Sequence, residues 1–485
     1  MDCTEAIRLN PQLSEAYINR GIAKQAKGDF DGAILDCTEA IRFNPQAVLA
    51  YNARGLAKQT KGDLDDAILD YTEAIHINPQ AAFAYNNRGI AKQLKGDMDG
   101  AILDYNEAIR LNPQFADAYS NRGLVKQAKG DFDGAILDFT EAIRLNPQEA
   151  LAYSNRGIAK QAKRDLDGAI LDCTEAIRLE PQFAKPYAVR GNSKQLKGDF
   201  DGAILDFTES IRLEPQEAIT YNNRGYAKNA KGDLDGSILD YTEAIRLNPQ
   251  DAFAYTKRGL SKQDKDDFDG AILDYTEAIR LNPQEAEVYY TRGIAKQAKG
   301  DLNGTILDYN EAIRLNPQFA DAYSNRGLAK QAKGDIEGAI LDYNEAIHFN
   351  PQFANAYYNR GIAKNAKGDV DGAILDYTEA IRLNPQFADA YSNRGLAKQA
   401  KGDRKGAIED LESRLKITTH PEATKFLINL LKQQSREEYL KKDWIGAKFT
   451  ILKLKQYLSQ EAPEQKQLEQ KIQELDKLIQ EQEKK

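Results

Sequence analysis

Residues Glu311–Asp335 read EAIRLNPQFADAYSNRGLAKQAKGD, and this stretch decides how the whole chain is organised. It recurs unchanged at Glu379–Asp403 and with a single substitution at Glu107–Asp131. Twelve prolines, from Pro11 to Pro385, are spaced by 34 residues and give the phase of the repeat. Self-similarity at a fixed period of about 20 to 50 residues indicates a solenoid or an array of repeats. The function therefore has to be sought on a surface built by many similar units.

One repeat predicts a pair of helices. Asp321–Lys333 has the length of a helix and is followed by Gly334, which suits the left-handed conformation after a helix C-terminus. Asp335 stands at the N-cap of a second helix, Ile336–Phe349, and an Asn-Pro pair ends that helix. Neither helix can bury its apolar face alone, so we expect stacked helical hairpins.

The repeat resembles the tetratricopeptide repeat when its places are numbered from 1 to 34 with Ala320 as place 1. It has aromatic residues at places 4 and 24 (Tyr323 and Tyr343), glycine at place 8 (Gly327) and proline at place 32 (Pro351). Small residues stand at places 20 and 27. The resemblance covers about residues 2–420 and implies an all-α, right-handed superhelical solenoid of antiparallel helix pairs. We expect Gly327 to let the two helices approach, and the two tyrosines to fill the space between hairpins.

The repeat pattern predicts four segments. Residues 1–13 are a half repeat with the second helix only, and residues 14–420 are twelve repeats. Residues 421–460 form a degenerate hairpin, and residues 461–485 form a C-terminal helix. Because residue 1 stands at a place that usually holds Leu, we also expect the array to have begun further upstream.

The C-terminal helix carries one apolar stripe, formed by Leu468, Ile472, Leu475 and Ile479. Terminal repeats are atypical because they close the core against water, so a capping helix is the first interpretation. A short coiled-coil seam that gives weak self-association is the second.

Three charged places depart from the family pattern in nearly every repeat. Arg326 and Lys330 replace the family's usual Leu and Tyr on the first helix, and Asp342 replaces a frequent Tyr on the second. We predict a layer of ion pairs between the two helices. The alternative is a basic ladder that faces a ligand.

Composition limits the classes of function. The chain has 66 Lys and Arg against 74 Asp and Glu, a net charge of −8 that is spread along the repeats. This argues against nucleic-acid binding, which needs a basic stripe. No run of residues has the length and hydropathy of a membrane span, and no signal-peptide pattern is present. Cys3, Cys37 and Cys173 share one repeat place, where we expect unpaired core residues, and this usage favours a cytoplasmic location.

No catalytic or metal-binding constellation is evident. The histidines His76 and His348 stand at a place where other repeats carry Arg, and the aspartates near Gly32 lack the spacing of a calcium loop. We therefore expect a protein that is not an enzyme and needs no cofactor or metal.

The resemblance implies that places 2, 5, 6, 9, 12 and 13 of the first helices line a groove. Place 6 is asparagine in eight repeats: Asn19, Asn87, Asn121, Asn155, Asn223, Asn325, Asn359 and Asn393. Place 12 is Gln or Asn in all twelve, including Gln127, Gln161 and Gln331. A carboxamide both donates and accepts hydrogen bonds, so such a row suits the backbone of an extended peptide. The alternative is that these asparagines bond to neighbouring repeats. Place 5 is never Lys, which argues against a clamp for acidic C-terminal tails.

One section of the array breaks the pattern and is the predicted specificity section. It spans residues 185–264 and includes Lys185, Asn192, Tyr226 and Lys257. Neutral drift explains the same cluster almost as well.

The sequence favours a non-enzymatic scaffold that binds a protein or peptide partner in the groove, without nucleic acid or membrane. Two alternatives stay open. The array is either the substrate-recruiting part of a larger enzyme or signalling protein, or a structural spacer with no groove ligand.

Overall fold

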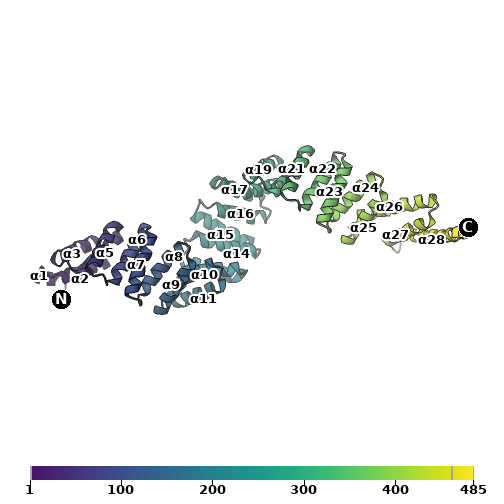
Figure 1. The fold of residues 1–485 in the computed structure, drawn as a ribbon. Coiled ribbons are helices and arrows are strands. Elements are labelled where there is room, and N and C mark those ends of the chain that lie inside the picture. The colour runs from purple at the N-terminus through teal and green to yellow at the C-terminus, as the bar shows by residue number, and fades with distance from the viewer. Residues whose placement is uncertain (1–2, 460–461, 484–485) are drawn as a thin grey trace. The chain divides into compact units, whose positions relative to one another are not determined.

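The computed structural model describes residues 3–459 and 462–483, and within them every regular element is a helix. The chain divides into two compact units, residues 1–249 and 250–485. In each unit, helices follow one another in packed pairs (Figure 1). The predicted all-α solenoid of antiparallel helix pairs is confirmed.

The first unit contains the half repeat and the first seven repeats, as far as residue 249. Its helices are α1 (Cys3–Leu9), α2 (Ser14–Ala26), α3 (Phe30–Phe43), α4 (Val48–Lys61), α5 (Leu64–Ile77), α6 (Ala82–Lys95), α7 (Met98–Leu111), α8 (Ala116–Ala128), α9 (Phe132–Leu145), α10 (Ala150–Ala162), α11 (Leu166–Leu179), α12 (Ala184–Leu196), α13 (Phe200–Leu213), α14 (Ala218–Ala230) and α15 (Leu234–Leu247).

The second unit contains the remaining repeats and the C-terminal helices. These are α16 (Ala252–Gln263), α17 (Phe268–Leu281), α18 (Ala286–Ala298), α19 (Leu302–Leu315), α20 (Ala320–Ala332), α21 (Ile336–Phe349), α22 (Ala354–Ala366), α23 (Val370–Leu383), α24 (Ala388–Ala400), α25 (Arg404–Ile417), α26 (Pro421–Leu440), α27 (Trp444–Tyr457) and α28 (Glu464–Glu483).

The helix boundaries follow the local signals of the repeat. α20 begins and ends one residue earlier than predicted, and α21 has the predicted bounds. Gly334 between them has a φ of +87°, a conformation that glycine adopts without a steric penalty. The side chain of Asp335 accepts a hydrogen bond from the backbone N–H of Gly338, as an N-cap does.

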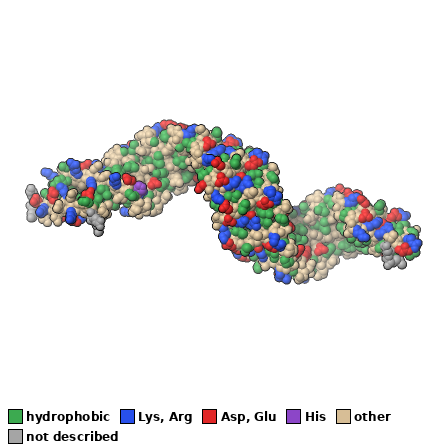
Figure 2. Space-filling model, turned by 180° about the vertical axis from the view of Figure 1, so that it is seen from behind, with side chains coloured by type: hydrophobic (Ala, Val, Ile, Leu, Met, Phe, Trp, Pro, Cys, Tyr) green, Lys and Arg blue, Asp and Glu red, His purple; other side chains and the backbone are tan. Residues whose placement is uncertain are grey.

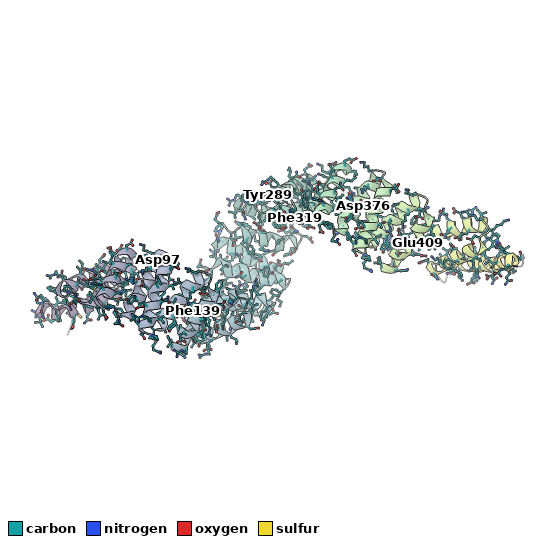
Figure 3. All side chains as sticks on the ribbon, in the orientation of Figure 1. Asp97, Phe139, Tyr289, Phe319, Asp376 and Glu409 are labelled. Atoms are coloured by element: carbon teal, nitrogen blue, oxygen red, sulfur yellow. The ribbon has the colours of Figure 1, made fainter. Side chains whose placement is uncertain are left out.

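The core of each hairpin is built around the aromatic residue at place 24. Tyr343 is fully buried, and a Cβ added to Gly327 would lie 2.8 Å from its ring. Glycine at place 8 is therefore required for the close approach of the helices, as predicted. Phe139 on α9 fills the same place in another repeat (Figure 3).

The cysteines are free, and Cys37 and Cys173 are fully buried at place 24. Burial raises the pKa of the Cys173 thiol to about 12, so it remains a neutral thiol near neutral pH. Both act as small core residues, as predicted.

The C-terminal helices close the second unit. Leu475 on α28 is fully buried against Ala447 and Ile451 of α27, and Leu468 and Ile472 pack at the same contact. The apolar stripe of α28 thus packs within the chain, which is the contact that a capping helix makes. Residues 460–461 and 484–485, at the ends of the predicted segments, and residues 1–2 of the half repeat lie outside the described residues.

Candidate binding face

A triad of charged residues joins the two helices of each repeat. The guanidinium of Arg326 and the ammonium of Lys330 contact the two carboxylate oxygens of Asp342 at 2.6 and 2.8 Å, and the side chain of this aspartate is 4% exposed. The same triad recurs in all twelve repeats, and includes Asp376 in Figure 3. The predicted ion-pair layer is confirmed, and these cations are not a ligand-facing ladder.

The arginine of the triad also reaches the preceding repeat. Nη1 of Arg326 donates to Oδ1 of Asn310 at 2.7 Å, and Nη1 of Arg88 donates to the hydroxyl of Thr72 at 3.1 Å. Both acceptors stand at place 25 of the preceding second helix. One guanidinium therefore holds its own hairpin together and links it to its neighbour, a role that the sequence analysis missed.

In the first repeat, the carboxylate of the triad stays charged despite its burial. At Asp36 burial raises the pKa, but hydrogen bonds from Arg20 and Lys24 outweigh that effect and hold the pKa below its usual range. Asp36 is thus ionised at neutral pH.

The asparagines at place 6 form two groups. In four of them Nδ2 donates to the side chain at place 5 of the preceding repeat, so they bond to a neighbouring repeat, as the alternative interpretation had it. These contacts are Asn87 to Asn52 (2.9 Å), Asn121 to Asn86 (3.1 Å), Asn325 to Tyr290 (2.9 Å) and Asn393 to Tyr358 (3.1 Å).

The other asparagines at place 6 do not make this contact within the described residues. The reason is the length of the preceding side chain at place 5, which is too short to reach the amide. Ser120 precedes Asn155, Ala188 precedes Asn223, and Ser324 precedes Asn359. Asn19 stands in the first full repeat and is exposed. We call Asn155, Asn223 and Asn359 the open asparagines, and Asn87, Asn121, Asn325 and Asn393 the bonded asparagines.

The glutamine at place 12 is a partner of the buried tyrosine. Oε1 of Gln331 accepts a hydrogen bond from the hydroxyl of Tyr343 at 3.0 Å. Where place 24 is Phe139, Oε1 of Gln127 is buried and has no hydrogen-bond partner in the described part of the chain. The main contact of a place-12 glutamine opposite a tyrosine is therefore with the buried core, where its Oε1 accepts a hydrogen bond from the tyrosine at place 24.

Gln161 stands opposite a cysteine and makes a different contact. Its Nε2 donates to the hydroxyl of Ser193 at 2.9 Å and to the carbonyl of Val189 at 3.2 Å. Both partners belong to the next repeat, so this glutamine links two hairpins.

Family models identify the repeats by sequence. Models described as "TPR repeat" and "Tetratricopeptide repeat" match residues 18–82, 94–149, 189–252 and 264–402. The chain belongs to the tetratricopeptide repeat family. No curated protein matches it in a sequence search.

Several solved structures are similar to parts of the array. MamA is 30% identical over 36% of this chain and 94% of its own, with a TM-score of 0.33. YrrB, titled a TPR protein with an unusual peptide-binding site, is 22% identical over 40% of this chain and 97% of its own, with a TM-score of 0.35. Yeast Tom70 is 18% identical over 81% of this chain and 96% of its own, with a TM-score of 0.34. The family assignment rests on the repeat models.

The predicted specificity section does not lie within one unit. Lys185 and Asn192 are on α12 and Tyr226, 44% exposed, is on α14, all in the first unit of the array. Lys257 is on α16 in the second unit, where its Nζ lies 5.2 Å from the centre of the Phe253 ring. Specificity at these four positions stays a prediction.

A pocket of about 350 Å³ opens beside Lys257 in the second unit. Its lining includes Phe253 and Thr256 from the same helix, Glu285 from the loop between α17 and α18, and Glu287 from α18. Repeat places 2, 5, 6 and 34 thus converge on one hollow of the tetratricopeptide surface.

Charge is balanced along the array. On the face shown in Figure 2, Lys and Arg side chains alternate with Asp and Glu, and neither sign forms a continuous stripe. Among the described residues, no group of three or more His, Cys, Asp or Glu is placed to hold a metal ion. No helix within the described ranges has the length and apolarity needed to cross a membrane.

Proposed function

We propose that this tetratricopeptide array is a non-enzymatic protein-interaction scaffold that holds an extended peptide segment along the face of its first helices. The observation that carries the proposal is the row of place-6 carboxamides, in which the open asparagines Asn223 and Asn359 are partly exposed and make no bond to the preceding repeat, whereas Asn155 is only 3% exposed. Amide groups of this kind pair with a peptide backbone whatever its side chains are.

The bonded asparagines have a different role in this proposal. Each already uses one N–H on its neighbouring repeat, so it fixes the spacing of successive hairpins. The open asparagines lie at the same place without that partner, which makes them the stronger candidates for contact with a ligand.

Two sets of variants test the proposal on the full chain. The first changes Asn155, Asn223 and Asn359 to Ala, and the second changes the four bonded asparagines to Ala. Each set is used with the wild type to capture peptides from an immobilised random library and proteins from native lysate. Circular dichroism establishes beforehand that each variant is folded.

We expect the first set to lose captured peptides at an unchanged unfolding midpoint, and the second to lower the midpoint. If the wild type and the first set capture the same peptides equally well, the binding site does not lie on this face. An empty capture by the wild type would favour a spacer.

A further inference from the structure

The strongest unexplained feature lies between α8 and α10, where several buried polar atoms have no partner. The side chains of Ser120 and Ser154 are at places 5 of successive repeats, and these residues are 8% and 0% exposed. Among the described residues neither hydroxyl has a hydrogen-bond partner, and the buried Oε2 of Glu149 has none either. A buried polar group without a partner is costly, so a donor from outside the chain would be favourable here.

Two carboxylates meet at this place without a cation of their own. Neither Asp117, at place 2 of α8, nor Glu149, in the loop before α10, forms an ion pair within the described part of the chain. The two are close enough to affect each other: burial raises the pKa of Glu149, and the charge of Asp117 adds to that rise. Negative charge is thus concentrated without compensation.

The second unit shows what the same places do in another repeat. There the pocket beside α16 is lined by Phe253, Thr256, Lys257 and Glu285, at places 2, 5, 6 and 34. Lys257 brings a positive charge next to Glu285. In the α8 repeat, place 6 is Asn121, whose amide is bonded to the preceding repeat, and place 2 is Asp117. The pocket beside α16 thus has Lys257 with two carboxylates, Glu285 and Glu287, whereas the place beside α8 has two carboxylates and no cation.

We propose that Asp117, Ser120, Glu149 and Asn155 form a subsite that takes a cationic side chain, arginine or lysine, of the bound segment. A guanidinium or ammonium group offers several N–H donors and no acceptor, which matches a site made of unpaired carboxylate and hydroxyl oxygens. Asn155 stands at place 6 of the following repeat and is 3% exposed, so it belongs to the buried wall of this subsite. This inference rests on the proposed peptide-binding function and assigns a side-chain preference to one part of the face.

The chain contains its own matched control. In the repeat that begins at Ala320, the same places hold Asp321 and Ser324, and the open asparagine is Asn359. Place 34 of that repeat is Phe353 in place of a glutamate. The variant Glu149→Phe therefore imitates a packing that the array already contains, and Glu149→Gln removes the charge alone.

The test measures binding of Nα-acetyl-arginine methylamide and of its neutral analogue, Nα-acetyl-citrulline methylamide, to the full chain by titration calorimetry at low salt. We expect the wild type to prefer the arginine probe by about tenfold, the ratio that follows from one charge-assisted contact of about 1.4 kcal/mol. Glu149→Gln and Glu149→Phe should abolish the preference.

Equal binding of the two probes by the wild type, or an undiminished preference in Glu149→Gln, would overturn the subsite. Folding of Glu149→Phe is checked by circular dichroism. If this variant is unfolded, the result for Glu149→Gln is the test of the subsite. The result is separable from the proposed function. If the wild type captures no peptides but still prefers the arginine probe, the groove is refuted and the subsite is not. If it captures peptides but binds both probes equally, the subsite alone is refuted.

Discussion

At the scale of single residues, three positions within the described ranges have a left-handed backbone without being glycine. Arg164, Asp266 and Lys442 have φ values of 66°, 61° and 63°, where ten other hairpins have glycine. For a residue other than glycine this conformation costs about 1 kcal/mol of free energy.

Arg164→Gly is therefore expected to stabilise the first unit by about 0.5–1 kcal/mol. The measurement is the denaturant midpoint followed by circular dichroism. Gly130→Arg, the reverse change at the same place of the preceding repeat, should lower the midpoint. No shift in Arg164→Gly would show that the turn stores no strain.

The buried tyrosines give a second prediction at this scale. Phe139→Tyr should place a hydroxyl within reach of the unpartnered Oε1 of Gln127, as Tyr343 does for Gln331. We expect a gain of about 1 kcal/mol in the free energy of unfolding, because a buried acceptor becomes satisfied. Tyr343→Phe should cost a similar amount. If both changes proved neutral in denaturant melts, water would be satisfying these glutamines.

At the scale of the helical hairpin, the ion triad is the main device that this array adds to its family. It replaces apolar and aromatic residues by three charges that satisfy one another, and its arginine links adjacent hairpins. Removing one partner leaves charges without compensation in a partly buried site.

Asp342→Asn is expected to destabilise the second unit by about 2–4 kcal/mol, because it leaves the positive charges of Arg326 and Lys330 without a carboxylate partner. The triple variant Arg326→Leu, Lys330→Tyr and Asp342→Tyr restores the usual family residues and should recover much of that loss. Thermal melts of the wild type and the two variants measure these differences in stability. A single variant as stable as the wild type would mean that the triad sets register without contributing stability.

The terminal hairpin gives another prediction for an element. Leu475→Asp should detach α28 from α27, because Leu475 is buried against Ala447 and Ile451. Trp444 is the only tryptophan of the chain and packs at this contact, so its fluorescence should shift to the red at temperatures where the rest of the array stays helical. Leu440→Asp, at a 72% exposed position on α26, is the control and should leave the spectrum unchanged.

At the scale of the whole molecule, stability is tied to ionised carboxylates repeated along the chain. Hydrogen bonds from arginine lower the pKa of Glu107, Glu141 and Glu311, and that of Asp36 is also lowered as the net result of burial and its two cations. A carboxylate with a depressed folded-state pKa stabilises the fold above its unfolded pKa and loses that contribution as the pH falls through the folded value.

The unfolding midpoint is therefore expected to be nearly constant between about pH 7 and 5 and to fall below about pH 4, where these groups protonate. Differential scanning calorimetry across this range measures the effect. Because exposed pairs are screened by salt and buried ones much less, about 1 M sodium chloride should remove only part of the dependence. A midpoint that rises on acidification would contradict the assignment of these pKa values.

The repeat period, the hairpin, the glycine at place 8 and the ion layer could all be predicted from the sequence. Each depends on residues within one 34-residue unit, such as Arg326 and Asp342, whose contact is local and recurs twelve times. The open and bonded asparagines could not be separated in this way. Asn121 and Asn155 occupy identical places, and their difference depends on the residue 35 positions earlier, Asn86 or Ser120.

The sequence by itself determined the family, the register of the helices and the partners inside each hairpin, because local periodicity dictates which side chains face one another. Only the tertiary structure decided what stacking does to the polar residues between hairpins. It showed that Gln331 satisfies Tyr343, that Asn325 is held by Tyr290, and that Ser120 and Glu149 have buried oxygens with no donor. The physical reason is that a hydrogen bond needs a partner at the right distance, and the length of a side chain in the neighbouring repeat sets that distance.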